Sequence, residues 1–291
     1  MRLARSTWPA VREYFESNDT VVIAVGSIED HGRQNPLGTD AMAPDRLLDL
    51  IEERDPDVLI APTLPYGATD DLVGFPGTVS LGVDCLVDVM THITDCLHSY
   101  GARRFVFLNG HGGNVKPLTT VAMALNRAGN LAALLNWWRI APQLNPAWGG
   151  GHGGAMETSA NLAIDPDSVD LSQVADECLR DDVSPEMRSV GWYKVRFDGV
   201  DVDMPRDLVR FASNGWVAEG FEDHPAHSSA QLGREMLQGT AQYVVKFIDA
   251  LRRAPLPEPL DAARELRAAD EDIARRGSAS GLAIDPGAAR A

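Results

Sequence analysis

TVVIAVGSIEDHGRQNPLGTD, residues 20–40, places a short apolar run directly before a group of side chains that can bind a metal. Residues 20–26 are rich in β-branched side chains and end at a glycine, which predicts a buried strand. Residues 40–54 carry apolar side chains at helical spacing, and Pro44 falls in the first turn, where proline is tolerated. The stretch therefore predicts a strand, a polar loop and a helix.

The same alternation continues along the chain. Short apolar runs bounded by glycine, proline or polar residues predict further strands over 57–67, 103–110 and 131–138. Apolar side chains at helical spacing predict helices over 9–17, 83–102, 115–129, 155–164 and 230–253. Strands that alternate with helices form a parallel sheet with helices on both faces and right-handed crossovers. The predicted fold is α/β, a three-layer α/β/α sandwich with a mainly parallel sheet.

A single α/β domain is predicted over residues 1–253, with residues 164–222 as an insertion or excursion that mixes acidic turns with short apolar pieces. Residues 139–154 are rich in proline and glycine and predict a loop. Residues 254–291 are rich in Ala, Pro, Arg, Asp and Glu and predict a partly ordered C-terminal tail, or an arm that reaches a neighbouring subunit.

Composition excludes several classes of partner. The chain has 26 Lys and Arg against 42 Asp and Glu, a formal net charge of -16, which repels nucleic acid and anionic membrane surfaces. Its 3 cysteines are widely spaced and form no CxxC pair, which suits a reducing compartment. No secretory leader and no membrane-spanning run is visible. A cytoplasmic protein that acts on a small molecule is expected.

Reactive side chains follow three of the predicted strands. Glu29, His31 and Asp40 follow the first, His111 in NGHGGN follows the third, and the stretch HGGAMETS, residues 152–159, follows the fourth. Ligands bind beyond the carboxyl ends of the strands in open parallel sheets, so these stretches should converge. Taken singly, Asp40 could cap a helix, Glu29 could lie in a surface turn and His111 could bond to backbone. Their joint position favours a metal site.

Histidine and carboxylate ligands together suit Zn²⁺, Mn²⁺ or Fe²⁺. Two such ions about 3.5–4 Å apart would generate a hydroxide at neutral pH and polarise the carbonyl that it attacks. The expected cofactor is therefore two divalent metal ions per chain, with Zn²⁺ preferred and Mn²⁺ or Fe²⁺ as alternatives. This donor set is suited to hydrolysis.

The sequence resembles the creatininase family of metal-dependent hydrolases over residues 21–237. The resemblance is carried by GSIEDHG…PLGTD, FPGTVSL at 75–81, NGHGGN, HGGAMETS and a P-A-x-S-S-A-x-x-G stretch at 225–233. It implies the same sandwich, a two-metal site and a homohexamer.

By position, the resemblance implies that Glu29, Asp40 and His111 bind one metal, and that His31, Asp40 and Glu157 bind the second. Asp40 would bridge the two ions. His152 resembles the residue that positions substrate or passes a proton to the leaving nitrogen, and it is the predicted general acid. The predicted catalytic residues are His152 and Glu157.

Two departures from the family pattern concern the substrate. Gly113 stands where creatininases proper tend to have a glutamate, so creatinine is not the expected substrate. The family text G-P-H-L-P-L becomes Gly-Arg-Gln-Asn-Pro-Leu at 32–37, which adds hydrogen-bond donors suited to a polar or anionic molecule. Predicted substrate-binding residues are Arg33, Gln34, Asn35, Tyr66, Asp70 and Trp148. Asp71 is a further candidate near the site, and Trp137 and Trp138 are expected either to pack in the core or to wall the pocket.

The predicted function is hydrolysis of a small polar molecule at a cyclic amide or another carbon–nitrogen bond, such as an amide or formamide. One alternative is hydrolysis of a cyclic sugar ketone on the same site. Another alternative is a non-catalytic metal-binding subunit, although all five ligand positions hold competent side chains.

Overall fold

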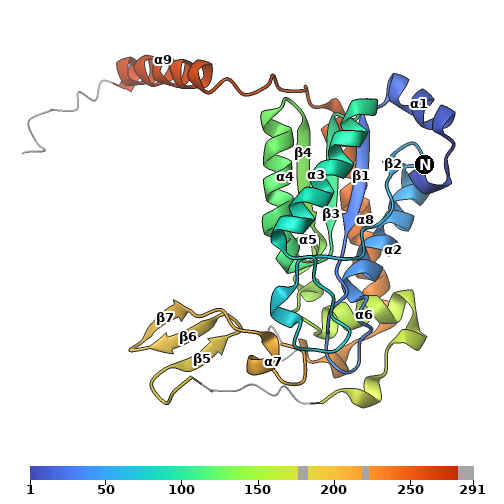
Figure 1. Ribbon diagram of the computed structural model, residues 1–291, viewed down its shortest axis with the longest axis vertical. Helices are drawn as coiled ribbons and strands as arrows, with labels where there is room; N and C mark the ends of the chain where they lie inside the picture. The colour runs from blue at the N-terminus through green and yellow to red at the C-terminus, as the bar shows by residue number, and fades with distance from the viewer. Residues whose placement is uncertain (176–182, 218–222, 281–291) are drawn as a thin grey trace, which may run out of the picture.

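The computed structural model describes residues 1–175, 183–217 and 223–280, and its centre is a parallel sheet. The strands, in the spatial order β2-β1-β3-β4, are β1 (Thr20–Val25), β2 (Leu59–Ile60), β3 (Arg104–Asn109) and β4 (Leu131–Asn136). Helices cover both faces of this sheet (Figure 1). The predicted three-layer α/β/α fold with a parallel sheet is confirmed.

The predicted helices are present with small shifts at their ends. They are α1 (Trp8–Ser17), α2 (Thr39–Arg54), α3 (Val83–Tyr100), α4 (Val115–Arg127), α6 (Ala155–Ile164) and α8 (Ala230–Arg253). Further helices are α5 (Trp137–Leu144), the short α7 (Leu208–Phe211) and α9 (Ala262–Ser280).

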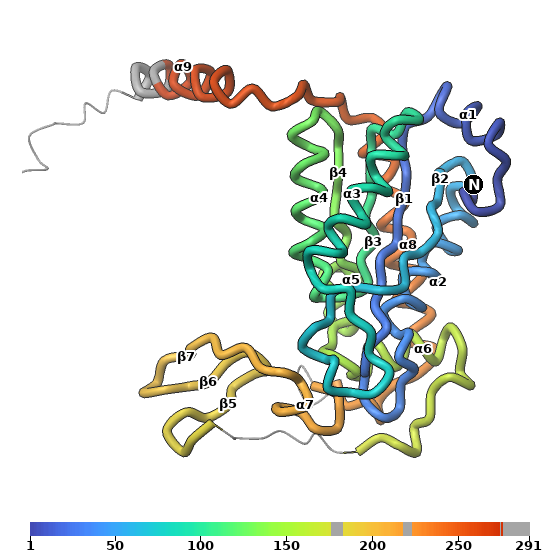
Figure 2. Tube along the Cα trace, viewed as in Figure 1, coloured from blue at the N-terminus to red at the C-terminus, as the bar shows by residue number. Residues whose placement is uncertain are grey.

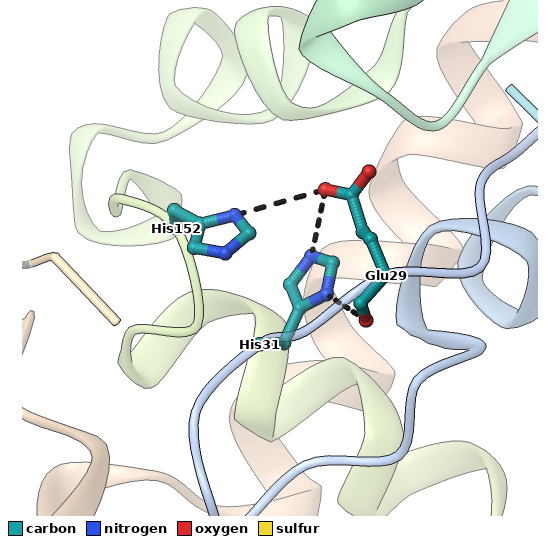
Figure 3. A group of neighbouring side chains, drawn as sticks. All are labelled: Glu29, His31 and His152. Carbon is teal, nitrogen blue, oxygen red and sulfur yellow. Dashed lines mark hydrogen bonds and ion pairs between the residues drawn. The ribbon is translucent and has the colours of Figure 1, made fainter. Parts of the chain in front are cut away.

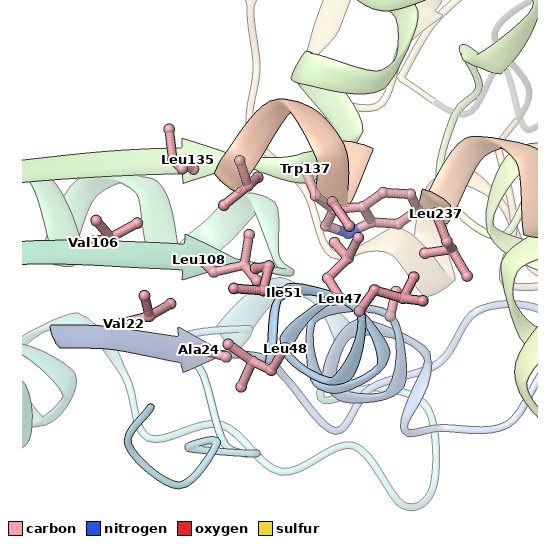
Figure 4. Close-up of a cluster of buried hydrophobic side chains, with 14 of the residues drawn as sticks. Val22, Ala24, Leu47, Leu48, Ile51, Val106, Leu108, Leu135, Trp137 and Leu237 are labelled. Carbon is pink, nitrogen blue, oxygen red and sulfur yellow. The ribbon is translucent and has the colours of Figure 1, made fainter. Parts of the chain in front are cut away.

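Two apolar cores lie on the two faces of the sheet because successive strand side chains point to opposite sides. Val22 and Ala24 of β1 pack against α2, α5, α6 and α8, as Figure 4 shows for part of this core. Val21 and Ile23 pack instead against α1, α3 and α4. Every side chain of β1 is buried, so the strand reads as a continuous apolar run rather than as an alternating one.

Three strands of the sheet end side by side, and this alignment positions the loops that carry the candidate site residues. Val25 pairs with Asn109, and Asn109 pairs with Asn136, so β1, β3 and β4 all end at the same height. The loops that follow them therefore start side by side. The chain passes from β1 to β2 on one side of β1 and then to β3 on its other side, so the strand order reverses between β1 and β3. Parallel sheets bind ligands at such a reversal.

Two parts of the chain differ from the sequence prediction. Residues 137–144 form α5 rather than a strand end and a loop, because their apolar side chains pack on α8 although Pro142 interrupts the helical pattern. Residues 188–203 of the predicted excursion form an antiparallel sheet of β5 (Arg188–Gly191), β6 (Lys194–Phe197) and β7 (Val200–Asp203). This sheet stands out from the body at the end where β1, β3 and β4 stop (Figure 1).

The C-terminal region leaves the body at the opposite end. Leu260 N donates to Arg127 O, which holds the segment after α8 against the end of α4. Helix α9 then stands clear of the rest of the chain (Figure 2), and Leu266 and Ile273 are about two-thirds exposed, at 67% and 68%. Residues 281–291 of the predicted tail lie outside the described residues. The division into one domain and a tail stays a prediction.

Candidate active site

Two glycines allow helix α2 to approach the strand ends closely. A Cβ atom at Gly26 would lie 2.6 Å from the Asp40 carbonyl oxygen, and one at Gly110 would also collide with that oxygen. The missing side chains therefore let the first turn of α2 sit directly on the ends of β1 and β3. This contact carries Asp40 to the side chains of Glu29, His31 and His111.

The first group of ligand atoms surrounds one nitrogen of His111. Its Nδ1 lies 3.0 Å from Glu29 Oε1 and 3.0 Å from Asp40 Oδ2. On the other side of the ring, Nε2 lies 3.0 Å from Ala68 O and can donate its proton there. In the neutral imidazole this bond leaves a lone pair on Nδ1, directed at the two carboxylates.

The second group is built in the same way around His31. Its Nε2 lies 3.1 Å from Asp40 Oδ1 and 3.5 Å from Glu157 Oε2. Its Nδ1 lies 3.3 Å from the Glu29 carbonyl oxygen, which can accept the ring proton. Glu157 is held in turn by the backbone N–H of Gly153, which donates to Oε2 at 2.7 Å.

Asp40 connects the two groups because each of its carboxylate oxygens faces one of them. This is the arrangement of a bridging carboxylate between two cations. Both carboxylate oxygens of Glu29 and Oδ2 of Asp40 are buried and accept no hydrogen bond from the described residues. Oxygens and ring lone pairs at such distances repel one another unless a cation lies among them. The residues therefore fit two metal ions.

The electrostatics of the site favour a cation for the same reason. Burial opposes a charge on His31, but the carboxylates of Asp40 and Glu157 outweigh it and raise its pKa to about 10. Burial likewise opposes a charge on His111, yet Glu29 and Asp40 raise its pKa well above the usual value. Burial raises the pKa of Glu157 to about 7. Metal ions compete with protons for such ligands, so the negative potential that draws protons also attracts a metal.

His152 lies beside the two groups rather than within either set that Asp40 joins. Its Nδ1 is 3.9 Å from Glu29 Oε1, and its ring centroid is 4.3 Å from that of His31. Figure 3 shows the His152 ring beside Glu29 and His31. Burial and the neighbouring His31 lower the pKa of His152 to about 3, so its ring is neutral. Glu29, His31 and His152 also form a third group of potential ligands.

A cavity of about 380 Å³ opens above these groups. Its lining includes acidic residues and two histidines, here together called the acidic wall: Glu29, Asp40, Asp71, Glu157, His111 and His152. It also includes three aromatic residues and one arginine, here together called the aromatic wall: Trp138, Arg139, Trp192 and Tyr193. The volume is in the range of small-molecule sites.

The aromatic wall includes three residues that sequence reasoning missed. Trp192 and Tyr193 follow β5, and their rings stack at 5.0 Å with an angle of 8°. The Trp192 ring lies 5.4 Å from that of His152, and its Nε1 donates to Arg206 O. Arg139 lies in the first turn of α5. Two features of the sequence could have indicated these residues. Trp192 and Tyr193 are adjacent aromatic residues between β5 and β6, and Arg139 directly follows the strand predicted over 131–138.

The residues predicted to bind substrate lie elsewhere. None of the six residues predicted to bind substrate is among the described residues that line the cavity. The amide of Gln34 donates to Gly153 O at 2.9 Å, and that of Asn35 donates to Thr158 Oγ1 at 2.9 Å, so both fasten the loop of His152. Their donors are already used within the protein, which is why they are not directed at a ligand.

The other four candidates also lie outside the cavity, where they contact other residues of the chain or are exposed to solvent. Arg33 points to Gln173 at 3.5 Å, and Asp70 accepts a hydrogen bond from Ser80. Tyr66 is exposed, and Trp148 packs on the core beside α8. Of the further candidates, Asp71 and Trp138 line the cavity, whereas Trp137 is buried in the core.

Gly113 has no room for a side chain. A Cβ atom there would collide with Ala68 O and would lie 2.6 Å from His111 Nε2. The backbone before the short helix at residues 70–72 thus occupies the space into which a glutamate at this position would project. The departure of this chain from the family pattern is therefore built into its backbone packing.

Comparisons with known proteins agree with the resemblance seen in the sequence. A sequence model of the family Creatininase, described as creatinine amidohydrolase, matches residues 4–248. The mycofactocin precursor peptide peptidase of Mycolicibacterium smegmatis is 34% identical over 178 residues, which cover 59% of this chain and 69% of that protein. The creatinine amidohydrolase of Pseudomonas putida is 32% identical over 193 residues, which cover 58% of this chain and 74% of that protein.

A more distant relative matches more of the chain. The 3-dehydro-scyllo-inosose hydrolase of Thermotoga maritima is 24% identical over 271 residues, which cover 86% of this chain and 83% of that protein. The match to the mycofactocin precursor peptide peptidase of Mycobacterium ulcerans, at 32% identity and over 56% of this chain, spans 62% of that protein, less than two thirds of its length.

Solved structures agree in fold. A creatinine amidohydrolase (creatininase) has a TM-score of 0.68 at 25% identity, over 87% of this chain and 98% of that chain. One named "Creatininase Mn" has a TM-score of 0.66 at 26% identity, over 87% and 99%. A creatininase variant of "Zn-Zn type" has a TM-score of 0.66 at 25% identity, over 87% and 98%. None of the helices in the described part of the chain is long and apolar enough to cross a membrane.

Proposed function

The chain belongs to the creatininase family and is a hydrolase, and from this premise we propose that it uses two divalent metal ions to cleave a carbon–nitrogen bond in a small polar molecule. The bond is that of a cyclic amide, another amide or a formamide. The observation that carries the proposal is Asp40, whose two oxygens face two separate sets of ligands. Relatives that are an amidohydrolase and a peptidase both support carbon–nitrogen cleavage.

Glu29, Asp40 and His111 would hold one ion, and His31, Asp40 and Glu157 the other. Zn²⁺ is preferred and Mn²⁺ or Fe²⁺ are alternatives, because mixed nitrogen and oxygen donors serve all three. When bound, such ions activate water and polarise a carbonyl.

His152 is the residue of the chain that we assign to proton transfer. It is half-buried beside Glu29 and His31 and faces the cavity without being needed by either set of ligands that Asp40 joins. A neutral imidazole in this place can accept a proton from water and return it to the departing nitrogen. Glu157 fixes the position of this loop through Gly153 N as well as serving as a ligand. The aromatic wall would exclude water from the substrate.

A second candidate is hydrolysis of a cyclic sugar ketone. It is supported by the Thermotoga maritima relative, whose match extends over 86% of this chain. The same ligands would serve, so the two candidates differ in the substrate and not in the metal site. A non-catalytic metal-binding subunit is the third possibility. A homohexamer and a cytoplasmic location stay predictions from the resemblance and the composition.

The test is the metal content per chain, measured by elemental analysis after reconstitution, together with hydrolysis of creatinine, cyclic amides, formamides, short peptides and sugar ketones. We expect about two ions per chain in the wild type. Asp40→Asn should bind at most one ion and lose more than about 100-fold of its activity, because both sets of ligands share this carboxylate.

The matched control is Asp49→Asn, which removes an exposed carboxylate from the same helix. It should keep both ions and full activity. A wild-type protein that holds no metal after reconstitution contradicts the proposal. Two bound ions with no hydrolysis of any of these substrates would support the metal-binding subunit instead.

A further inference from the structure

The cavity contains one permanent positive charge among the described residues that line it, the guanidinium of Arg139. In a chain with a net charge of -16, acidic partners for an arginine are plentiful. Arg139 nevertheless forms no ion pair within the described part of the chain, and its only ring contact is with Trp138, whose centroid lies 5.8 Å from its Cζ atom. Its five N–H donors therefore remain available to a ligand.

The position of Arg139 on its helix is electrostatically unfavourable for the fold. It lies in the first turn of α5, where the helix dipole is positive and where a carboxylate rather than a cation is stabilising. No acidic residue accompanies it in that turn. The dipole and the guanidinium instead add to one another, so both favour an anion at the aromatic wall. A placement that costs the fold stability in this way is expected of a functional residue.

The ring of Trp138 orients the guanidinium without using its donors. A cation–π contact with an aromatic face restricts the long side chain and uses none of its N–H donors. A carboxylate can accept two parallel N–H bonds from the guanidinium. Trp192, which lines the same cavity, packs against a separate apolar cluster that includes Leu208 and Phe211, so its position is also fixed.

We infer that Arg139 binds a carboxylate of the substrate, and that the substrates are amides that carry this carboxylate away from the bond that is cleaved. The inference rests on the proposed function, because it places the reacting carbonyl at the acidic wall and the anionic group at the aromatic wall. Creatinine has no carboxylate before its ring opens, so the inference also separates this enzyme from the family's namesake.

The experiment compares probes that differ in one group, which is a carboxylate in one probe and the uncharged amide in the other. Hippurate and hippuramide form one pair, and N-acetyl-L-leucine and its amide form another. Each is titrated calorimetrically into Zn²⁺-reconstituted wild type, Arg139→Gln, Arg139→Lys and the control Lys116→Gln, which removes an exposed cation from the same edge of the sheet.

The wild type and Lys116→Gln should bind the carboxylates about 10- to 100-fold more tightly than the amides, as expected for hydrogen bonds to a charged group. Arg139→Gln should lose this preference. Arg139→Lys should keep part of it, because lysine supplies charge without the planar fork. A preference that survives in Arg139→Gln places the carboxylate on the metals and overturns the inference, as does failure of both carboxylates to bind to the wild type.

The two proposals fail in different ways. Hydrolysis of amides without a preference for carboxylates contradicts the role of Arg139 and leaves the proposed function standing. A preference that depends on Arg139 in a protein that holds no metal or cleaves no amide contradicts the proposed function and the amide part of the inference, and leaves the binding of a carboxylate by Arg139 standing.

Discussion

Asp40 lies in the first turn of α2, where the sequence allows it to be either a helix cap or a metal ligand. The residue that caps α2 is Gly38, and no side chain bonds to the free N–H groups there. Asp40 directs its oxygens at His31 and His111 instead. Its burial, with 3% of the residue exposed, gives it no access to bulk water as an alternative partner. At the scale of the residue, ligation is the role that its surroundings support.

Gly113 allows a prediction at the same scale. Gly113→Ala should weaken metal binding by about 10- to 100-fold, because the new Cβ atom collides with Ala68 O and pushes against the His111 ring. The bond from His111 Nε2 to Ala68 O, which orients this ligand, would be lost. Competition with a chelator measures the affinity.

Gly112→Ala is the matched control for that substitution. A Cβ atom at Gly112 meets nothing within 4 Å, so the affinity should stay within about twofold of the wild type. Equal affinities in the two variants would show that the His111–Ala68 contact does not position the ligand.

The N-terminus of α6 shows how one element depends on a distant residue. Its cap is Gly154, which has no side chain, and Asp223 supplies the missing carboxylate from elsewhere in the chain. Asp223 Oδ2 accepts from Gly151 N at 2.6 Å, and Oδ1 accepts from Ala155 N at 2.9 Å. The two bonds span the loop that carries His152 and fix the turn that carries Glu157.

Asp223→Ala should therefore lower kcat about 10- to 100-fold with a smaller change in KM, because it misplaces groups that act on the reaction rather than on substrate binding. Steady-state kinetics on the best amide substrate provides the measurement, with metal content checked in parallel. Asp167→Ala, an exposed residue in the turn after α6, is the control. A loss confined to thermal stability, with kcat unchanged, would give Asp223 a structural role only.

The whole molecule is a sheet between two apolar cores, and Tyr14 links three of its elements. From α1 it donates its hydroxyl to Thr20 O of β1 at 2.6 Å and accepts from Leu59 N of β2 at 3.2 Å. Burial raises the pKa of Tyr14 above its usual value of 10.0, because the charged phenolate would lose water. The native chain therefore holds this proton more tightly than the unfolded chain.

The sign of the pH dependence follows from that difference. The contribution of Tyr14 to the free energy of unfolding is complete below pH 10 and is lost as the pH rises through the pKa of the native state. Tyr14→Phe should be less stable than the wild type by about 1 kcal/mol at pH 8, through loss of the hydroxyl bonds. Above pH 10 the gap should narrow by up to about 1.4 kcal/mol per pH unit.

Urea unfolding of both proteins at pH 8, 10 and 11 measures this gap. All other titrating groups are common to the two chains, so their effects cancel in the difference. A gap that is constant or widens with pH would mean that the phenol gains no proton affinity on folding.

Much of the fold could be predicted because buried apolar side chains form continuous runs in central strands and recur at helical spacing in helices. Strands β1 and β3 are buried throughout and apolar except at their ends, and helices such as α3 and α8 repeat their apolar side chains at helical spacing. Strands β6 and β7 do alternate, as Lys-Val-Arg-Phe and Val-Asp-Val-Asp on either side of Asp-Gly at 198–199, which is a hairpin signal that the sequence prediction missed. Each strand has only four residues and most of their side chains are exposed, so no buried apolar run marks them. Helix α5 was hidden by Pro142 and by its direct continuation from β4.

By itself, the sequence determined the α/β sandwich, the edge of the sheet at which reactive residues gather and the identities of the ligand candidates, because each of these depends on residues close together in the chain. Only the tertiary structure decided that Asp40 faces both histidines, that Asp223 caps α6, and that Arg139 and Trp192 share one cavity. These contacts join segments that are distant in sequence, and their geometry is set by the close approach of backbones at glycines such as Gly26 and Gly110, which no local pattern records.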